Sequence, residues 1–229
     1  MKLAWTLIAV LVLTGCSKEP PPYESRYTEP ADTKPVAVTV IGDSFTAGTE
    51  YGGQGGAGWP MLAAVKLRGQ GVDVAMARPA QEGAGWVEPN SKGTVFATEV
   101  KGNVSEATSL VVLFGSLNDG SIPPEVLTPA VVATLADVKA AAPNARLLVI
   151  GPPTLGRGTP EKPGKMPAVR DAVKAGADAA GAVFVDPIAE NWFSDPAFIG
   201  ADGVHPSDAG HQMMAEKIAP LITTLLQQP

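Results

Sequence analysis

Three residues in this chain carry the side chains that serine-based acyl transfer requires. Ser44 lies two residues after Gly42, at the end of the apolar run Val36–Ile41. A serine hydroxyl becomes a nucleophile when a histidine takes its proton and a carboxylate holds the other imidazole nitrogen. His205 has such a carboxylate three residues before it, at Asp202. The sequence therefore offers a nucleophile, a base and an orienting acid.

The segment Asp202–His205 has two interpretations. Gly203 lets the chain bend, and Pro206 restricts His205 to an extended backbone, so the pair can be aimed at a serine. The same Asp and His could instead cap the helix that follows. The other histidine of the sequence, His211, is predicted inside that helix and is interpreted as structural.

A further group could stabilise negative charge on a carbonyl oxygen. Asn118 lies in Gly115–Asp119, directly after the apolar run Ser109–Phe114. An amide there, with backbone N–H groups, can supply several kcal/mol of transition-state stabilisation. Gly83, or alternatively Gly85, could bring a backbone N–H close because glycine permits close approach. Taken alone, the Asn-Asp cluster is more typical of a simple turn than of an oxyanion site.

Apolar strand-like runs alternate with helical segments along most of the chain. The expected strands are 36–41, 72–77, 109–114, 146–150 and 182–185, and the expected helices are 59–68, 124–141, 166–180 and 207–226, the last with Ser207 as N-cap. Continuously apolar strands are typical of sheets buried on both faces. The pattern predicts an α/β fold, a three-layer α/β/α sandwich around a five-stranded parallel sheet.

The candidate residues come from separate segments but share one position relative to this sheet. Ser44, Gly83 and Asn118 each follow the end of a predicted strand. In open parallel sheets, ligands bind beyond the carboxyl ends of the strands. We therefore expect these residues to meet at one rim.

The N-terminal segment predicts export and attachment to a membrane. Leu3–Leu13 is apolar but too short to span a bilayer, and it runs into Leu13-Thr14-Gly15-Cys16. This resembles a bacterial lipobox, which implies cleavage before Cys16, the single cysteine, and its lipidation. A plain secretory signal, or a cytosolic protein with an apolar start, is the alternative. The expected organisation is a signal peptide at 1–15, a proline-rich tether at 16–34 and one domain at 35–229.

Four sequence blocks in order resemble the SGNH hydrolase family, also called GDSL esterases and lipases. The blocks are Gly42–Phe45, a glycine after the second strand (Gly83), Gly115–Asp119 and Asp202–His205. The resemblance covers roughly residues 36–226 and implies the flavodoxin-like SGNH fold. It implies Ser44 as nucleophile, His205 as base and then acid, and Asp202 as orienter. It also implies an oxyanion hole from the Ser44 N–H, the Gly83 N–H and the Asn118 amide.

Two departures from the family pattern concern the oxyanion hole. The second block lacks the Asn often found before its glycine, with Ala77 or Arg78 near that place, and the third block is one residue longer than usual. The expected function is a lipid-anchored, extracytoplasmic serine esterase. Alternatives are a carbohydrate O-acetylesterase or acyltransferase acting on cell-envelope glycans, and a non-catalytic surface binding protein with the same fold.

Other features narrow the possible partners. The formal net charge of −6 argues against nucleic acid. No His, Cys or Asp grouping has metal-ligand spacing, so neither a metal nor a cofactor is expected. The glycine-rich stretch 52–58 lacks the features of a phosphate-binding loop and is interpreted as a mobile wall of the cleft. The partners expected are an ester substrate and, through Cys16, the membrane; the sequence does not predict the oligomeric state.

Overall fold

The computed structural model describes residues 34–155 and 165–227, all but the first of which belong to one compact unit, Pro35–Pro229. The predicted signal peptide, Cys16 and nearly all of the tether lie outside the described residues. Within the two described ranges, no helix has both the length and the hydropathy that a membrane span requires.

The expected strands are all present, with ends that differ by at most two residues. They are β1 (Val36–Gly42), β2 (Val74–Ala77), β3 (Leu110–Phe114), β4 (Arg146–Ile150) and β5 (Val183–Val185). The four expected helices are α2 (Trp59–Gly69), α4 (Pro124–Ala141), α5 (Met166–Ala179) and α6 (Asp208–Gln227). Ser207 caps α6 as predicted, because its Oγ accepts the N–H of Gly210.

Two helices were not expected from the sequence, α1 (Ser44–Ala47) and α3 (Phe96–Asn103). α3 contains Thr98, Val100 and Gly102, which are poor helix formers. It contacts α4 and β1, and it buries Phe96 and Val100. Tertiary packing therefore decides this helix rather than local preference. Three short 3-10 turns, η1 (Gly55–Ala57), η2 (Asn118–Ser121) and η3 (Pro196–Phe198), complete the elements.

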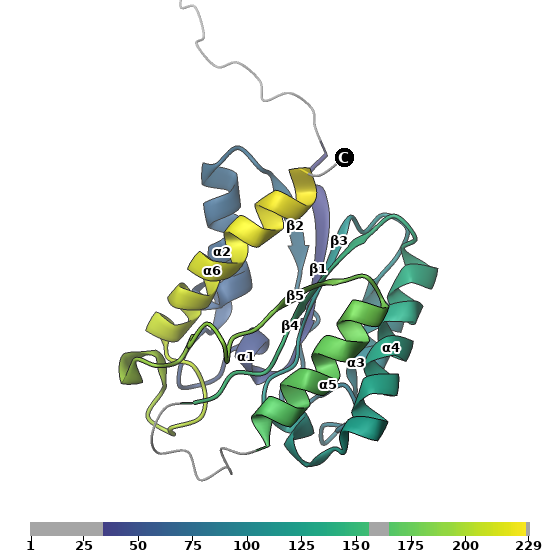
Figure 1. The fold of residues 1–229 in the computed structure, drawn as a ribbon. Helices are drawn as coiled ribbons and strands as arrows, with labels where there is room; N and C mark the ends of the chain where they lie inside the picture. Colours follow the sequence, from purple (N-terminus) through teal and green to yellow (C-terminus); the bar gives the residue numbers. More distant parts are fainter. Residues whose placement is uncertain (1–33, 156–164, 228–229) are drawn as a thin grey trace, which may run out of the picture. The chain divides into compact units, whose positions relative to one another are not determined.

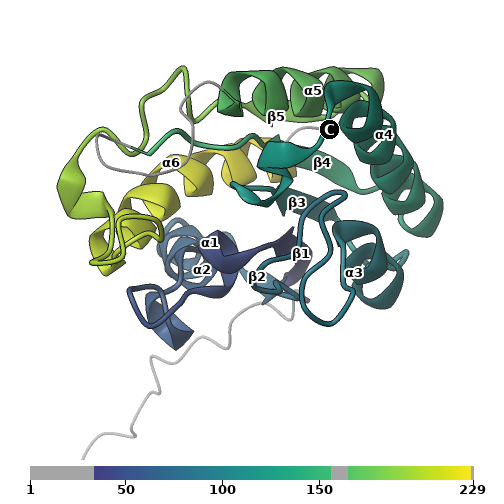
Figure 2. The same cartoon turned by 90° about the horizontal axis from the view of Figure 1, so that it is seen from below.

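The sheet is parallel throughout, in the order β2-β1-β3-β4-β5. Helices α2 and α6 cover one face, and α3, α4 and α5 cover the other (Figures 1 and 2). This confirms the predicted three-layer α/β/α class with a flavodoxin-like strand order. The chain moves from β1 outward to β2, then back to β3 and onward to β4, so the switch point lies between β1 and β3.

The apolar strands supply both faces of the core at once. Along β3, Leu110, Val112 and Phe114 pack toward α2 and α6. Val111 and Leu113 pack toward the opposite helices. Successive side chains of a strand point to opposite faces, so a strand between two helical layers must be apolar at every position. All five of these residues are fully buried.

Candidate active site

Ser44 stands at the switch point of the sheet. β1 ends at Gly42. A Cβ atom there would collide with the side chain of Thr46 and meet the carbonyl of Phe114. Because glycine has no Cβ, the chain can turn back directly into α1. Ser44 is the first residue of that helix. Its side chain is nearly buried, with 8% of the residue exposed. The Ser44 Oγ atom lies 3.1 Å from Nε2 of His205.

Asp202 holds the imidazole of His205 from the other side. Its Oδ2 lies 2.6 Å from His205 Nδ1, and its Oδ1 accepts the backbone N–H groups of Val204 and His205, each at 3.0 Å. Burial raises the pKa of Asp202, but the bonds from the imidazole and from both N–H groups outweigh it and lower that pKa. Asp202 is therefore held as a carboxylate, and in a neutral imidazole this places the proton on Nδ1 and the lone pair on Nε2, toward Ser44.

Asp43, directly before Ser44, is a functional residue that sequence reasoning missed. Its carboxylate is fully buried. Oδ1 accepts the N–H of Phe45 at 2.9 Å, which caps α1, and Oδ2 accepts the Ser116 N–H at 2.8 Å and the Ser116 hydroxyl at 2.5 Å. Asp43 thus ties the turn that carries Ser44 to the loop after β3. An acidic residue beside the predicted nucleophile was the available signal.

Asn118 also reaches Asp43. Its Nδ2 lies 3.2 Å from Asp43 Oδ2 and donates to the Ala84 carbonyl at 2.8 Å. The extra residue in Gly115–Asp119 therefore does not move Asn118 away from the Ser44 turn. The amide bridges the segments that follow β1, β2 and β3, and the bond to Asp43 is the longer of its two.

The two glycines considered for the oxyanion hole have other structural roles. Gly83 is exposed, with φ of +76°, and it is the third residue of a turn closed by the Ala84 N–H to the Gln81 carbonyl. Glycine is favoured at that position of a type II turn. The N–H of Gly85 donates to the carbonyl of Glu88 at 2.8 Å, within the same loop.

The contact between this loop and the end of β1 is made by Gln81 instead. Its N–H donates to the Gly42 carbonyl at 3.0 Å. The carboxylate of Asp119 explains why a glycine is needed at position 85. This carboxylate accepts the N–H groups of residues 86–88 at 2.8–3.0 Å. A Cβ atom on Gly85 would lie 2.6 Å from an oxygen of that carboxylate.

His211 is structural, as expected, and it supports the glycine-rich stretch. Its imidazole is completely buried, with Nδ1 accepting the Trp59 N–H at 3.3 Å. Gly53 lies against the ring, where any Cβ would collide with it. Burial lowers the pKa of His211 to about 4, with Asp208 opposing the shift and Arg78 adding to it. Gly52 and Gly53 are thus packed, whereas Gly55 and Gly56 border open space.

Other residues near the candidate site have structural roles. Arg78 donates to the carbonyls of Thr46 and Ala47, at the end of α1, rather than toward Ser44. Three tryptophans are buried in the core: Trp59, Trp86 and Trp192. Among the described residues, no group of three or more His, Cys, Asp or Glu side chains could hold a metal ion.

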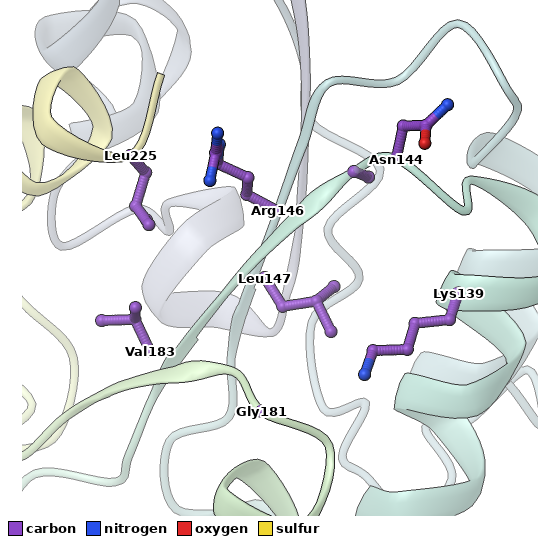
Figure 3. A pocket seen from close by; sticks show the side chains of 8 residues that line it. Lys139, Asn144, Arg146, Leu147, Gly181, Val183 and Leu225 are labelled. Atoms are coloured by element: carbon purple, nitrogen blue, oxygen red, sulfur yellow. The ribbon is translucent and has the colours of Figure 1, made fainter. Parts of the chain in front are cut away.

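The structure also has a surface pocket of about 340 Å³ (Figure 3). It is lined by residues that include Arg146, the first residue of β4, and Val183, the first residue of β5. Ser44 follows the last residue of β1. Because the strands are parallel, the pocket lies at the opposite end of the sheet from Ser44.

The fold and the Ser–His–Asp arrangement define a class of hydrolases, and comparison identifies the family. The chain belongs to the GDSL-like lipase/acylhydrolase family, whose profile matches residues 40–213. It is 44% identical over 224 residues to GDSL lipase Rv0518 of Mycobacterium tuberculosis, a match that covers 95% of this chain and 93% of that protein.

Solved structures share the fold at lower identity. TesA superposes with a TM-score of 0.66 and 22% identity, covering 82% of this chain and 99% of that one. A carbohydrate esterase family 2 enzyme with a carbohydrate binding domain, from Corynascus thermopiles (Myceliophthora fergusii), gives 0.68 and 20%, covering 88% and 69%. These similarities agree with the SGNH resemblance found in the sequence.

Asp43 predicts one component of the pH dependence of stability. Burial raises its pKa from 3.8 to about 6, more than its hydrogen bonds lower it. Between these values the folded protein binds more protons at Asp43 than the unfolded chain does, so this contribution to the free energy of unfolding falls as pH rises. Relative to Asp43→Asn, wild type should lose about 2 kcal/mol from pH 4 to pH 6 in urea denaturation. Asp137→Asn, at a partly exposed carboxylate of α4, is the control and should show no such trend. A gain with rising pH would mean that the hydrogen bonds outweigh burial.

His211 predicts a component of opposite sign. Because its pKa falls from 6.5 to about 4 on folding, the unfolded chain binds more protons in this range, and stability rises with pH. His211→Gln retains an acceptor for Trp59 but cannot titrate. Relative to this variant, wild type should gain about 3 kcal/mol between pH 4 and pH 6.5, measured in the same way. Parallel curves for the two proteins would show that folding does not hold His211 neutral.

Proposed function

We propose that this protein is a serine esterase that hydrolyses carboxylic esters through an acyl-enzyme. The observation that carries the proposal is the continuous chain of contacts from Ser44 Oγ to His205 Nε2 at 3.1 Å, and from His205 Nδ1 to Asp202 Oδ2 at 2.6 Å. Membership of the GDSL-like lipase/acylhydrolase family supports it independently.

The reaction would use these groups in sequence. His205 Nε2 takes the Ser44 hydroxyl proton as the oxygen attacks the ester carbonyl, and Asp202 stabilises the resulting imidazolium. The tetrahedral intermediate collapses as His205 returns the proton to the departing alcohol. Water then attacks the acyl-Ser44 ester with His205 again as base, which releases the acid and the free serine.

Two groups beside Ser44 are suited to the negative oxygen of the intermediate. The first group is the backbone N–H of Ser44. Ser44 is the first residue of α1, where backbone N–H groups have no partner inside the helix. Asn118 can turn one amide hydrogen to the substrate by giving up its longer bond, the one to Asp43 at 3.2 Å. Catalytic hydrogen bonds commonly tighten only in the complex with substrate. We do not include Gly83 in the proposed oxyanion hole, because the turn at residues 81–84 already accounts for a glycine with positive φ at that position.

The nucleophile is tested directly by Ser44→Ala. This variant should lose at least about a thousandfold in kcat on p-nitrophenyl acetate, since no attacking oxygen remains. A fluorophosphonate probe should label wild type at Ser44 and leave the variant unlabelled. Thr134→Ala, which removes a buried hydroxyl of α4 that donates to the Ala130 carbonyl, is the matched control and should still be labelled. Unchanged turnover in Ser44→Ala would refute the esterase mechanism, and an unreactive wild type would favour a binding protein.

The substrate class is a separate question within the same proposal. Wild type assayed on O-acetylated glycans and on p-nitrophenyl esters of longer acids would separate a carbohydrate O-acetylesterase from a general esterase. Product analysis with a glycan acceptor present would detect acyl transfer in place of hydrolysis.

We further propose that the mature protein is lipid-anchored at Cys16 on the extracytoplasmic face of the cell membrane. The support is the apolar Leu3–Leu13 run ending in Leu13-Thr14-Gly15-Cys16, with no other cysteine in the sequence. Two or more acyl chains on one residue give stable membrane attachment, because each buried methylene adds about 0.8 kcal/mol.

Cys16→Ser tests the anchor. Wild type expressed in a bacterium should partition into the detergent phase of Triton X-114 and incorporate radiolabelled palmitate. The variant should do neither. Equal partitioning of the two proteins would exclude lipidation at Cys16 and leave the esterase proposal unaffected.

A further inference from the structure

Tyr51 lies beside the imidazole of His205 and belongs to no part of the mechanism above. The two rings are nearly parallel, with 5° between their planes and 6.1 Å between their centroids. Tyr51 is 38% exposed. The other aromatic ring beside this imidazole in the described structure is that of Phe45, which is 1% exposed. Of these two neighbours, only Tyr51 is open to a substrate.

Tyr51 sits at the tip of a tight turn. Thr49 and Gly52 exchange backbone hydrogen bonds of 2.8 and 3.1 Å, and the N–H of Tyr51 donates to Thr49 Oγ1 at 3.2 Å. The hydrogen bond that the Tyr51 hydroxyl donates to the Glu50 carboxylate raises the pKa of Tyr51, so its phenol stays neutral over the working range of an esterase. The turn therefore presents an uncharged aromatic side chain.

Close contacts fix this turn against the loop that carries His205. A Cβ atom on Gly200 would lie 2.6 Å from the Tyr51 Cβ, and the Gly200 N–H donates to the His205 carbonyl at 2.7 Å. On the far side of the turn, a Cβ on Gly52 would lie 2.5 Å from the carbonyl carbon of Ser207. Such contacts set the position of Tyr51 relative to the imidazole.

The chemistry of ester cleavage indicates which half of the substrate lies near Tyr51. His205 must return a proton to the alcohol oxygen as the tetrahedral intermediate collapses, so the alcohol half of the ester has to lie next to the imidazole. The acyl half remains on Ser44 after that step. A side chain stacked beside His205 and open to solvent therefore faces the leaving alcohol more closely than the acyl group.

We propose that Tyr51 is a specificity-determining residue that contacts the alcohol half of the ester and favours alcohols with a flat or apolar face. The inference rests on the proposed esterase function. An aromatic face buries apolar surface of a ring or a long alcohol and adds a stacking contribution, whereas methanol or ethanol offers little to contact. The selection acts on formation of the acyl-enzyme and not on its hydrolysis, because the alcohol has left by then.

The test compares Tyr51→Ala and Tyr51→Phe with wild type on two series of esters. One series joins acetate to methyl, cyclohexyl and benzyl alcohols, and the other joins p-nitrophenol to acids of increasing length. Tyr51→Ala should lose roughly tenfold more kcat/KM on benzyl and cyclohexyl acetate than on methyl acetate. Its relative preference among acids should match that of wild type, and Tyr51→Phe should follow wild type in both series.

Controls separate this role from a general effect on His205. Val65→Ala, which shortens a 65% exposed side chain on α2, should change neither preference. A uniform loss in Tyr51→Ala across both series, with a shifted pH profile of kcat/KM, would overturn the inference and make Tyr51 a positioning residue for His205. Altered preference among acids, or no change at all, would also overturn it.

Failure of the inference can be told from failure of the proposed function. If wild type hydrolyses the esters and reacts at Ser44 with a fluorophosphonate, the esterase function stands whatever Tyr51→Ala does. If wild type hydrolyses none of them and does not react, both proposals are wrong.

Discussion

The arrangement around Ser44 depends on one buried carboxylate, that of Asp43. A charged group with no exposure is tolerated only where donors surround it, and here the donors come from Phe45, Ser116 and Asn118. These residues belong to α1 and to the loop after β3, so satisfying the carboxylate fixes those segments against each other. Burial still raises the pKa of Asp43 to about 6. The hydrogen bonds to this carboxylate hold the proposed nucleophile in place, and the raised pKa shows that keeping the group charged has a local cost in free energy.

A second set of contacts brings the base to the nucleophile across the sequence. His205 lies 161 positions from Ser44 and reaches it because the start of α6 is anchored to the glycine-rich stretch and to the start of α2. The Gly53 N–H donates to Asp208 at 2.8 Å, and the Trp59 N–H donates to buried His211. The same contacts hold the turn that carries Tyr51. Gly52 and Gly53 of the glycine-rich stretch are thus packed and support the loop that carries His205, whereas Gly55 and Gly56 border open space.

The glycines after β2 show where sequence reasoning lost accuracy. Glycine permits both a positive φ and close approach, and a sequence does not say which of these is being used. Gly83 is needed for the positive φ of its turn, and Gly85 is needed because the Asp119 carboxylate approaches it closely. Asp119 was invisible as a loop anchor, because its partners are backbone N–H groups that every residue possesses. The oxyanion donors were therefore the least predictable part of the site.

The sequence by itself determined the fold class, the strand positions and the family. Each depends on local patterns: apolar runs such as Ser109–Phe114 for strands buried on both faces, and motifs such as Gly42–Phe45 and Asp202–His205. The sequence also nominated Ser44, Asp202, His205 and Asn118, and the structure brings these four to one rim. Only the tertiary structure decided the existence of α3, the roles of Asp43 and Asp119, and the position of Tyr51 beside the imidazole. Each of these depends on groups that are distant in sequence and come into contact only when the chain is folded. Burial and interatomic distance follow from those contacts, and the residue types alone do not specify them.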